Sequence, residues 1–279
     1  MAREIVKPLW TLFSAIFLIY LVNGAAQPQV PCYFIFGDSL SDSGNNNGLF
    51  TVAKANFRPY GIDFPRGPTG RFSNGRNLVD AVAELLGLGS YIPPFATARG
   101  KEILKGVNYA SGSAGIRNET GRQVTLYNFG ARKIVLFGLG AIGSAPSEVA
   151  ACGTKGSSCV AYINSAVQIF NGRLKSLVQE LNSNLRNAKF IYIDYYGIGS
   201  SYALSRGSLI TNVSCCGVKD GLNTCIPFQI PCRNRTRFMF WDGIHPTEAT
   251  NVFIAARAYK AEFLTDAFPY DIHSLAQLS

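Results

Sequence analysis

The chain has 279 residues, of which 47% are hydrophobic and 15% charged, a balance that excludes a disordered or low-complexity protein and fits one α/β domain. The formal net charge is +9, but no block of about five or more basic residues, such as nucleic-acid tails carry, occurs. We therefore expect no nucleic-acid partner. The dispersed positive charge is interpreted as a source of solubility or of weak attraction to an anionic polysaccharide matrix.

The N-terminal segment, residues 1–26, has the pattern of a secretory signal peptide. Arg3 and Lys7 precede the uncharged stretch 9–22, and three small residues close the segment. The apolar stretch is shorter than the roughly 20 residues that a membrane-spanning helix needs. We expect cleavage at the end of this segment, which leaves residues 27–279 as a single domain without a stable membrane span. An uncleaved membrane anchor is the alternative.

Four short apolar runs that end in loops of small or polar residues predict buried strands. They are Tyr33–Phe36, Val107–Ala110, Lys133–Leu139 and Lys189–Asp194. Helical patterns lie between and after them, at 77–86, along an amphipathic stripe from Ile163 to Leu185, and from about Thr247 onward. This alternation favours a mostly parallel sheet with helices on both faces.

One connection does not fit this pattern. Between the second and third predicted strands, Ser111–Arg132 contains several glycines and one short helix-like piece, Gln123–Phe129. Parallel strands need a crossover of about a dozen residues or more, usually helical. This crossover is therefore predicted to be truncated.

Seven cysteines follow the signal segment, and an oxidising compartment favours disulfides among them. Sequence proximity favours the pair Cys152–Cys159 and pairing within a four-cysteine cluster made of Cys215, Cys216, Cys225 and Cys232. Cys32, inside an apolar run, is the candidate for a buried free thiol. Metal ligation by the cluster is the alternative, although no histidine lies within it. Sequons at Asn118, Asn212 and Asn234 predict glycosylation.

The chain has two histidines, His245 and His273, and the second lies in a polar tail. His245 is therefore the candidate general base. Asp242 stands three residues upstream, a spacing that lets its carboxylate accept a hydrogen bond from Nδ1 and leaves Nε2 free to take a proton from a hydroxyl. A structural loop histidine beside a turn aspartate is the alternative.

Ser39 is the candidate hydroxyl. It follows the first predicted strand in the string Gly37-Asp38-Ser39-Leu40, and open α/β sheets place their sites at the carboxyl ends of strands. Backbone N–H groups of such a turn can bind an oxyanion. The alternatives are an ordinary polar loop and a calcium loop, but the glycine and final glutamate of an EF-hand are missing.

These motifs together resemble those of the plant GDSL esterase/lipases of the SGNH hydrolase superfamily. The matching blocks, in order along the chain, are Phe34–Asn46, Gly70–Arg76, Val107–Gly112 and Phe240–Pro246. The resemblance covers nearly all of residues 27–279. It implies a flavodoxin-like three-layer α/β/α sandwich with a mostly parallel sheet, the SGNH hydrolase fold, in a secreted protein of the cell wall or apoplast.

The resemblance also implies the roles of individual residues. Ser39 is the nucleophile, His245 the base and Asp242 the group that orients it, while the N–H groups of Ser39 and Gly112 form part of the oxyanion hole, with Gly115 as the alternative to Gly112. The implied activity is hydrolysis of carboxylic esters, lipid or other acyl esters, through an acyl-enzyme, without cofactor or metal. The expected partner is a small-molecule or polymer ester. The anionic matrix that attracts the positive charge is then cell-wall polysaccharide. The expected oligomeric state is a monomer.

The chain departs from the family at one place. Between the second block and the segment that resembles Tyr127–Lys133, members carry a stretch with a Gly-x-Asn-Asp block, whose asparagine donates to the oxyanion. This chain has no such string. We therefore expect a fold that misses one central strand, with lower stability and weaker activity. The alternative function is a catalytically impaired or inactive secreted glycoprotein that retains a cleft for acyl or cell-wall polysaccharide ligands.

Overall fold

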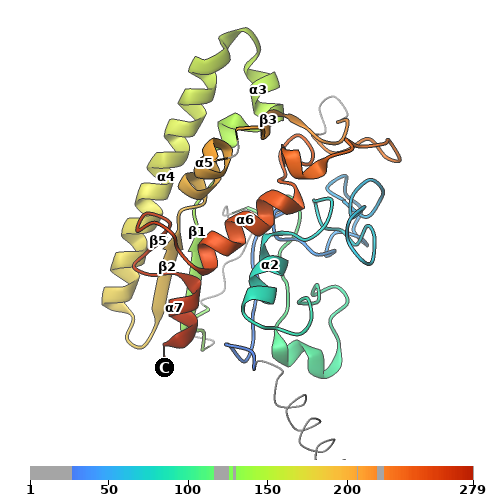
Figure 1. Cartoon of the computed structure of the whole chain (residues 1–279). Coiled ribbons are helices and arrows are strands. Elements are labelled where there is room, and N and C mark those ends of the chain that lie inside the picture. Colours follow the sequence, from blue (N-terminus) through green and yellow to red (C-terminus); the bar gives the residue numbers. More distant parts are fainter. Residues whose placement is uncertain (1–26, 116–125, 128–129, 206, 219–222, 279) are drawn as a thin grey trace, which may run out of the picture.

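Helices and strands alternate along the part of the chain that the computed structural model describes, residues 27–115, 126–127, 130–205, 207–218 and 223–278 (Figure 1). The α-helices are α2 (Leu78–Leu85), α3 (Pro146–Cys152), α4 (Gly156–Asn184), α5 (Tyr195–Ser205), α6 (Glu248–Tyr259) and α7 (Ile272–Gln277). The strands are β1 (Lys133–Phe137), β2 (Lys189–Ile193), β3 (Ile210–Ser214), β4 (Phe238–Phe240) and β5 (Ala267–Phe268). Short 3₁₀ helices are η1 (Gly100–Lys105), η2 (Ile142–Ser144), η3 (Gly153–Lys155) and η4 (Arg235–Arg237).

Strand β2 is the centre of the main sheet. The order is β1-β2-β5, in which β1 and β2 run parallel and β5 is antiparallel to β2. Both faces of β2 are covered, because Phe190 and Tyr192 pack against α4 whereas Ile191 and Ile193 pack against α6 (Figure 1). A strand that is buried on both faces requires a continuous apolar run. The third and fourth predicted strands are confirmed, each slightly shorter than expected.

The helix boundaries follow capping signals. Helix α2 begins after Asn77, whose side chain accepts from the Asp80 N–H while the Asp80 carboxylate accepts from the Asn77 N–H, a capping box. Gly87, with a φ of 76°, follows its end. Helix α6 begins after Thr247, whose hydroxyl accepts from the Thr250 N–H. The helices expected at these two places are confirmed, and so is the long helix α4.

The first two predicted strands stand apart from the main sheet. They meet in an isolated parallel bridge at Ile35 and Asn108, and Phe34 and Phe36 remain 47% and 52% exposed. Within the described residues, no strand pairs with the other edge of segment 33–36, and β1 lies at the edge of its own sheet. The continuous sheet expected from four strands is therefore not formed by these residues. Among the described residues, segment 33–36 and β1 each have a pairing partner along one side only.

The disulfides follow the expected grouping. Cys152–Cys159 is confirmed, and the four-cysteine cluster pairs as Cys215–Cys232 and Cys216–Cys225. Sulfur atoms that are bonded to each other cannot serve as thiolate ligands. The alternative prediction, that the four cysteines bind a metal ion, is therefore wrong. Cys32 is free but half-buried, not buried as expected, because its apolar run lies against a neighbouring segment along one edge only.

Some of the residues for which the sequence predicts secretion, glycosylation or a helix lie outside the described residues, and others are exposed. The signal segment 1–26, the sequon residue Asn118 and most of the helix expected at 123–129 lie outside the described residues. Asn212 is exposed on β3, and Asn234 is exposed at the start of η4. In the parts of the chain with assigned structure, no helix combines the length and the hydropathy that crossing a bilayer requires.

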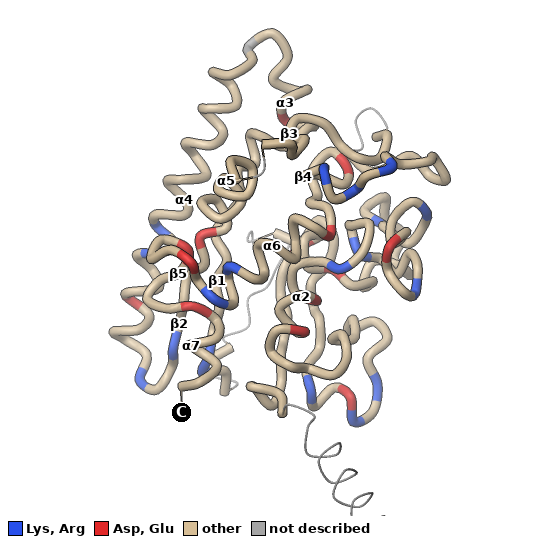
Figure 2. The backbone as a smooth tube through the Cα atoms, in the orientation of Figure 1, with Lys and Arg blue, Asp and Glu red and all other residues tan. Residues whose placement is uncertain are grey.

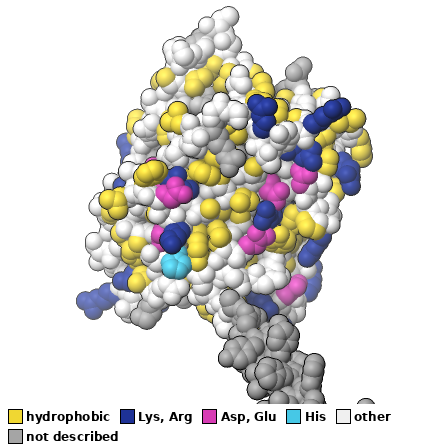
Figure 3. All heavy atoms as spheres, viewed as in Figure 1, with side chains coloured by type: hydrophobic (Ala, Val, Ile, Leu, Met, Phe, Trp, Pro, Cys, Tyr) yellow, Lys and Arg dark blue, Asp and Glu magenta, His cyan; other side chains and the backbone are white. Residues whose placement is uncertain are grey.

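Charge is dispersed over the described surface. In Figure 2 lysines and arginines occur in several separate segments, whereas α3, α5 and β3 carry none, and on the face drawn in Figure 3 basic and acidic side chains lie interspersed among apolar ones. This distribution agrees with the absence of basic blocks in the sequence.

The unpaired edges generate a stability prediction. We expect that insertion of a Gly-x-Asn-Asp strand and helix, taken from the family that the sequence resembles, between Gly121 and Arg122 raises the melting temperature by at least about 5 °C, because the added strand supplies backbone partners for both edges. Calorimetry measures the change. A Gly/Ser linker of equal length in the same place is the control. Equal melting temperatures for the natural chain and the strand insertion would show that the edges are already satisfied.

Candidate active site

Ser39 lies in a turn directly after segment 33–36. The Asp38 carboxylate accepts from the Leu40 N–H at 3.0 Å, and the Asp38 carbonyl accepts from the N–H groups of Ser41 and Asp42. These bonds close the turn. They hold the half-buried Ser39 side chain at the carboxyl end of the first predicted strand, as the sequence predicted.

Ser39 and the Asp242–His245 turn, which lie about 200 positions apart, form one line of hydrogen bonds. Ser39 Oγ lies 2.8 Å from His245 Nε2, and His245 Nδ1 lies 2.9 and 2.8 Å from the two carboxylate oxygens of Asp242. Asp242 is fully buried and His245 is 5% exposed. A carboxylate at Nδ1 fixes the tautomer with the proton on that nitrogen, so the Nε2 lone pair faces the serine hydroxyl. The structure thus brings together the three residues that the sequence singled out.

The Asp242–His245 turn is held by its own backbone. Asp242 Oδ1 accepts from the N–H groups of Ile244 and His245 at 2.9 and 2.8 Å. The Trp241 N–H donates to the His245 carbonyl at 2.7 Å, and the Gly243 N–H donates to the Asn223 carbonyl. The spacing of three residues therefore works because one carboxylate caps the turn and receives the imidazole at the same time.

Two aromatic residues that the sequence analysis did not assign to the site border it. Tyr60 donates its hydroxyl proton to Asp242 Oδ2 at 2.6 Å. The Phe72 ring lies against the His245 ring, with centroids 4.8 Å apart. Phe72 belongs to the block Gly70–Arg76, which the resemblance had already marked, whereas no local pattern points to Tyr60.

The oxyanion donors are only partly as expected. The Ser39 N–H makes no hydrogen bond to another described residue, and its oxyanion role stays a prediction. The Gly112 N–H, in contrast, donates to Asp42 Oδ2 at 2.9 Å. This bond engages the Gly112 N–H in the described structure, and the oxyanion role of Gly112 stays a prediction. Gly115 is exposed, and its proposed role stays a prediction.

Asp42 ties the first and second blocks together. Its Oδ1 accepts from the N–H groups of Gly44 and Asn45 at 2.7 and 2.8 Å, in addition to the Gly112 bond on Oδ2. Burial raises the pKa of the Asp42 carboxyl, and the backbone donors partly offset that shift. Nearby, the Asn108 amide donates to the Ser41 carbonyl. These bonds fix the loop that carries Ser39.

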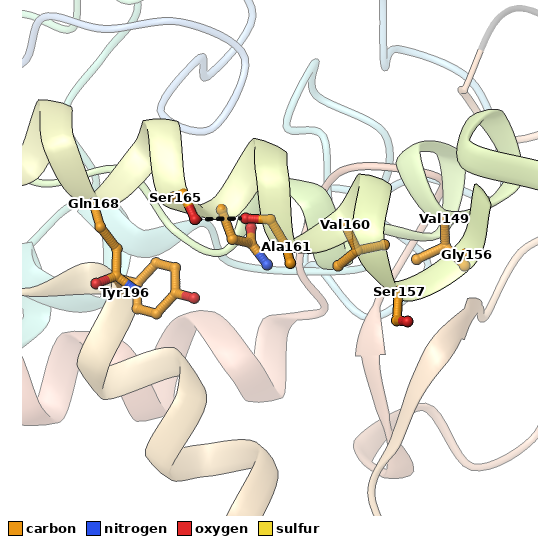
Figure 4. Close-up of a pocket in the computed structure, with 9 residues that line it drawn as sticks. Val149, Gly156, Ser157, Val160, Ala161, Ser165, Gln168 and Tyr196 are labelled. Atoms are coloured by element: carbon orange, nitrogen blue, oxygen red, sulfur yellow. Dashed lines mark hydrogen bonds between the residues drawn. The ribbon is translucent and has the colours of Figure 1, made fainter.

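Two cavities lie away from the serine. A cavity of about 640 Å³ runs along α4 and the end of α3, with Gln168, Ser165 and Tyr196 among its lining residues (Figure 4). A second, of about 410 Å³, lies between Asp63 and η4. Neither is lined by Ser39, Asp242 or His245. Both are therefore separate from the hydrogen-bonded line.

Comparison with known proteins identifies the family. The family model described as GDSL-like Lipase/Acylhydrolase matches residues 33–129 and 121–258. The chain belongs to the GDSL lipase/acylhydrolase family. Among its relatives, three GDSL esterase/lipases of Arabidopsis thaliana are 42%, 41% and 41% identical over 92%, 90% and 93% of this chain, and the alignments cover 94%, 94% and 96% of their own lengths.

The same comparison locates a difference from these relatives. The first alignment spans 345 positions, whereas 92% of 279 residues is about 257, so about 88 aligned positions have no residue in this chain. The two family matches overlap at residues 121–129, which marks an interruption of the family pattern there. This is the connection that the sequence analysis predicted to be truncated.

The Asp42 contacts predict a structural cost. We expect Asp42→Ala to lower the free energy of unfolding by about 2 to 4 kcal/mol, because three backbone N–H groups lose their acceptor. Asp42→Asn, which keeps one acceptor oxygen for Gly44 and Asn45, loses less. Chemical denaturation of the three proteins measures the difference. Equal stability of Asp42→Ala and the natural chain would mean that water or another group replaces the carboxylate.

Proposed function

We propose that this chain is a secreted hydrolase of carboxylic esters that acts through Ser39, His245 and Asp242. The observation that carries the proposal is the continuous line of hydrogen bonds from the serine hydroxyl to the buried carboxylate, with 2.8 Å at the serine–imidazole step. Family membership supports the reaction class, since the relatives named above are esterase/lipases. No cofactor is required by this chemistry.

The reaction has two halves. As Ser39 Oγ attacks the acyl carbon, His245 Nε2 takes the hydroxyl proton, and Asp242 stabilises the imidazolium that forms. Collapse of the tetrahedral intermediate breaks the ester C–O bond, and His245 gives its proton to the leaving alcohol. The same imidazole then takes a proton from water, whose oxygen attacks the acyl-enzyme. The acid is released and the Ser39 hydroxyl is restored.

The second candidate function is an impaired or inactive glycoprotein with a binding cleft. The observation that favours it is the oxyanion site, where the Gly112 N–H is engaged by Asp42 and the family's Gly-x-Asn-Asp string does not occur in the chain. Loss of one oxyanion donor lowers turnover about 10²- to 10³-fold in hydrolases that depend on it. We favour a weak hydrolase over an inactive protein, because the nucleophile, base and orienting carboxylate are all present and connected.

Cellular context and architecture belong to the same proposal. Residues 1–26 direct secretion to the cell wall or apoplast, and the three sequons carry glycans. The protein is a monomer with weak affinity for anionic wall polysaccharide, because residues 27–279 carry a net positive charge. Its architecture derives from the three-layer α/β/α sandwich of the family with one central strand missing. The alternation of helices and strands, with β2 covered on both faces, supports this reading.

Ester turnover tests the proposed residues. We expect the purified protein to hydrolyse a p-nitrophenyl ester, Ser39→Ala and His245→Ala to abolish turnover, and the rate to fall in acid, because a protonated imidazole can no longer act as base. His273→Ala is the matched control and leaves the rate unchanged. Undiminished turnover in His245→Ala would refute the proposed base.

A further inference from the structure

We propose that Tyr60 is a positioning residue of this site, which holds the Asp242 carboxylate and tunes the basicity of the imidazole. The inference rests on the proposed function for its catalytic meaning. It adds a fourth side chain to the line from Ser39 to Asp242, contributed by a loop more than a hundred residues away from the Asp242–His245 turn.

The phenol oxygen of Tyr60 makes two directed bonds. It accepts from the Cys225 N–H at 3.1 Å and donates to Asp242 Oδ2 at 2.6 Å. The accepted bond occupies one side of the oxygen, so the hydroxyl proton points to the carboxylate. Cys225 is itself tied to Cys216 by a disulfide. The backbone of Cys225 therefore fixes the direction in which the Tyr60 hydroxyl proton points.

The Tyr60 hydroxyl is a main hydrogen-bond donor to one of the two carboxylate oxygens of Asp242, Oδ2. Oδ1 has backbone donors from Ile244 and His245, whereas for Oδ2 the described residues provide only the imidazole Nδ1 and the Tyr60 hydroxyl. The titratable side chains that hydrogen-bond to Asp242 in this part of the structure are thus His245 and Tyr60. Without Tyr60, only the backbone bonds to Oδ1 and the His245 imidazole would fix the orientation of the carboxylate, and the imidazole is the group that the carboxylate has to orient.

Packing prevents the tyrosine from leaving this position. Tyr60 is fully buried, and its ring meets Phe57 and Phe72 edge-on, with centroids 5.3 and 6.0 Å apart. Trp241, which immediately precedes the catalytic aspartate, belongs to the same buried cluster. Because Phe72 also contacts the His245 ring, one aromatic cluster supports both members of the Asp–His pair.

Tyr60 stays a donor over the range in which an esterase works. Burial, together with the charge of Asp242 and the hydrogen bond to it, raises the pKa of the phenol well above its usual value of 10. The proton is therefore retained at neutral and mildly alkaline pH. A retained donor disperses the negative charge of the carboxylate, weakens its attraction for an imidazolium, and keeps His245 available as a base down to lower pH.

Nuclear magnetic resonance of the two histidine rings tests this inference directly. We compare the natural chain, Tyr60→Phe, and Tyr192→Phe, the last a buried tyrosine that donates to Asp194 at the main sheet. In Tyr60→Phe we expect the titration midpoint of the His245 ring to rise by about half a pH unit or more, because the undispersed charge favours the imidazolium. The midpoints of His273, and of both rings in Tyr192→Phe, stay in place.

Turnover gives the second readout. Tyr60 does not touch the serine, so we expect Tyr60→Phe to lower kcat several-fold with KM unchanged, and the acidic limb of the rate profile to move to higher pH. An unchanged His245 midpoint in folded Tyr60→Phe would overturn the inference. If that variant fails to fold, 3-fluorotyrosine at position 60 replaces it. This stronger donor is expected to lower the midpoint, and an unchanged midpoint again overturns the inference.

The two proposals fail in different ways. The ring titration needs no turnover, so an inactive natural chain whose His245 midpoint responds to Tyr60→Phe contradicts the proposed function but keeps the positioning role. In the opposite case, the natural chain is active, Ser39→Ala abolishes the activity, and the His245 midpoint is unchanged in Tyr60→Phe. That result supports the proposed function but contradicts the positioning role of Tyr60.

Discussion

The buried carboxylate of Asp242 is the constraint around which the site is organised. A fully buried charge costs several kcal/mol unless hydrogen bonds replace its water. Here the replacements come from its own turn, from the His245 imidazole and from the Tyr60 hydroxyl. The last of these is oriented by the Cys225 N–H within the disulfide-bonded cluster. Satisfying one charge therefore joins three distant segments of the chain and sets the imidazole toward Ser39.

The site forms although the sheet is incomplete, because the core does not depend on sheet continuity alone. Helix α6 packs against α2 on one side and against β2 on the other, in a single cluster that includes Leu78, Ile191 and Ile254. The buried ion pair Arg71–Asp80 secures the block before α2, and Arg257–Asp266 secures the end of α6. The packing of α6 against both α2 and β2 joins the segment before the main sheet to the sheet itself. Phe34 and Phe36, which precede the Ser39 turn, remain exposed among the described residues.

The features that the sequence predicted correctly depend on residues close together in the chain. The aspartate–histidine spacing, the serine after a strand and the helical pattern at 77–86 each lie within a few residues, and their observed geometry agrees with the sequence. The hydrogen bond from the Gly112 N–H to Asp42 was not predicted, because 70 positions separate the two residues. Tyr60 was missed for the same reason, since 182 positions separate it from Asp242. The cluster's disulfide partners likewise depend on topology and not on proximity.

Labelling with a fluorophosphonate, followed by peptide mass mapping, tests the central claim most directly, because the reagent reports an activated serine without requiring the natural ester. We expect one adduct, on Ser39, that forms more slowly in acid, where the imidazole is protonated, and is absent in the His245→Ala variant. An adduct on another serine, or no adduct on folded protein after prolonged exposure, would contradict the claim that the hydrogen-bonded line from Asp242 activates Ser39.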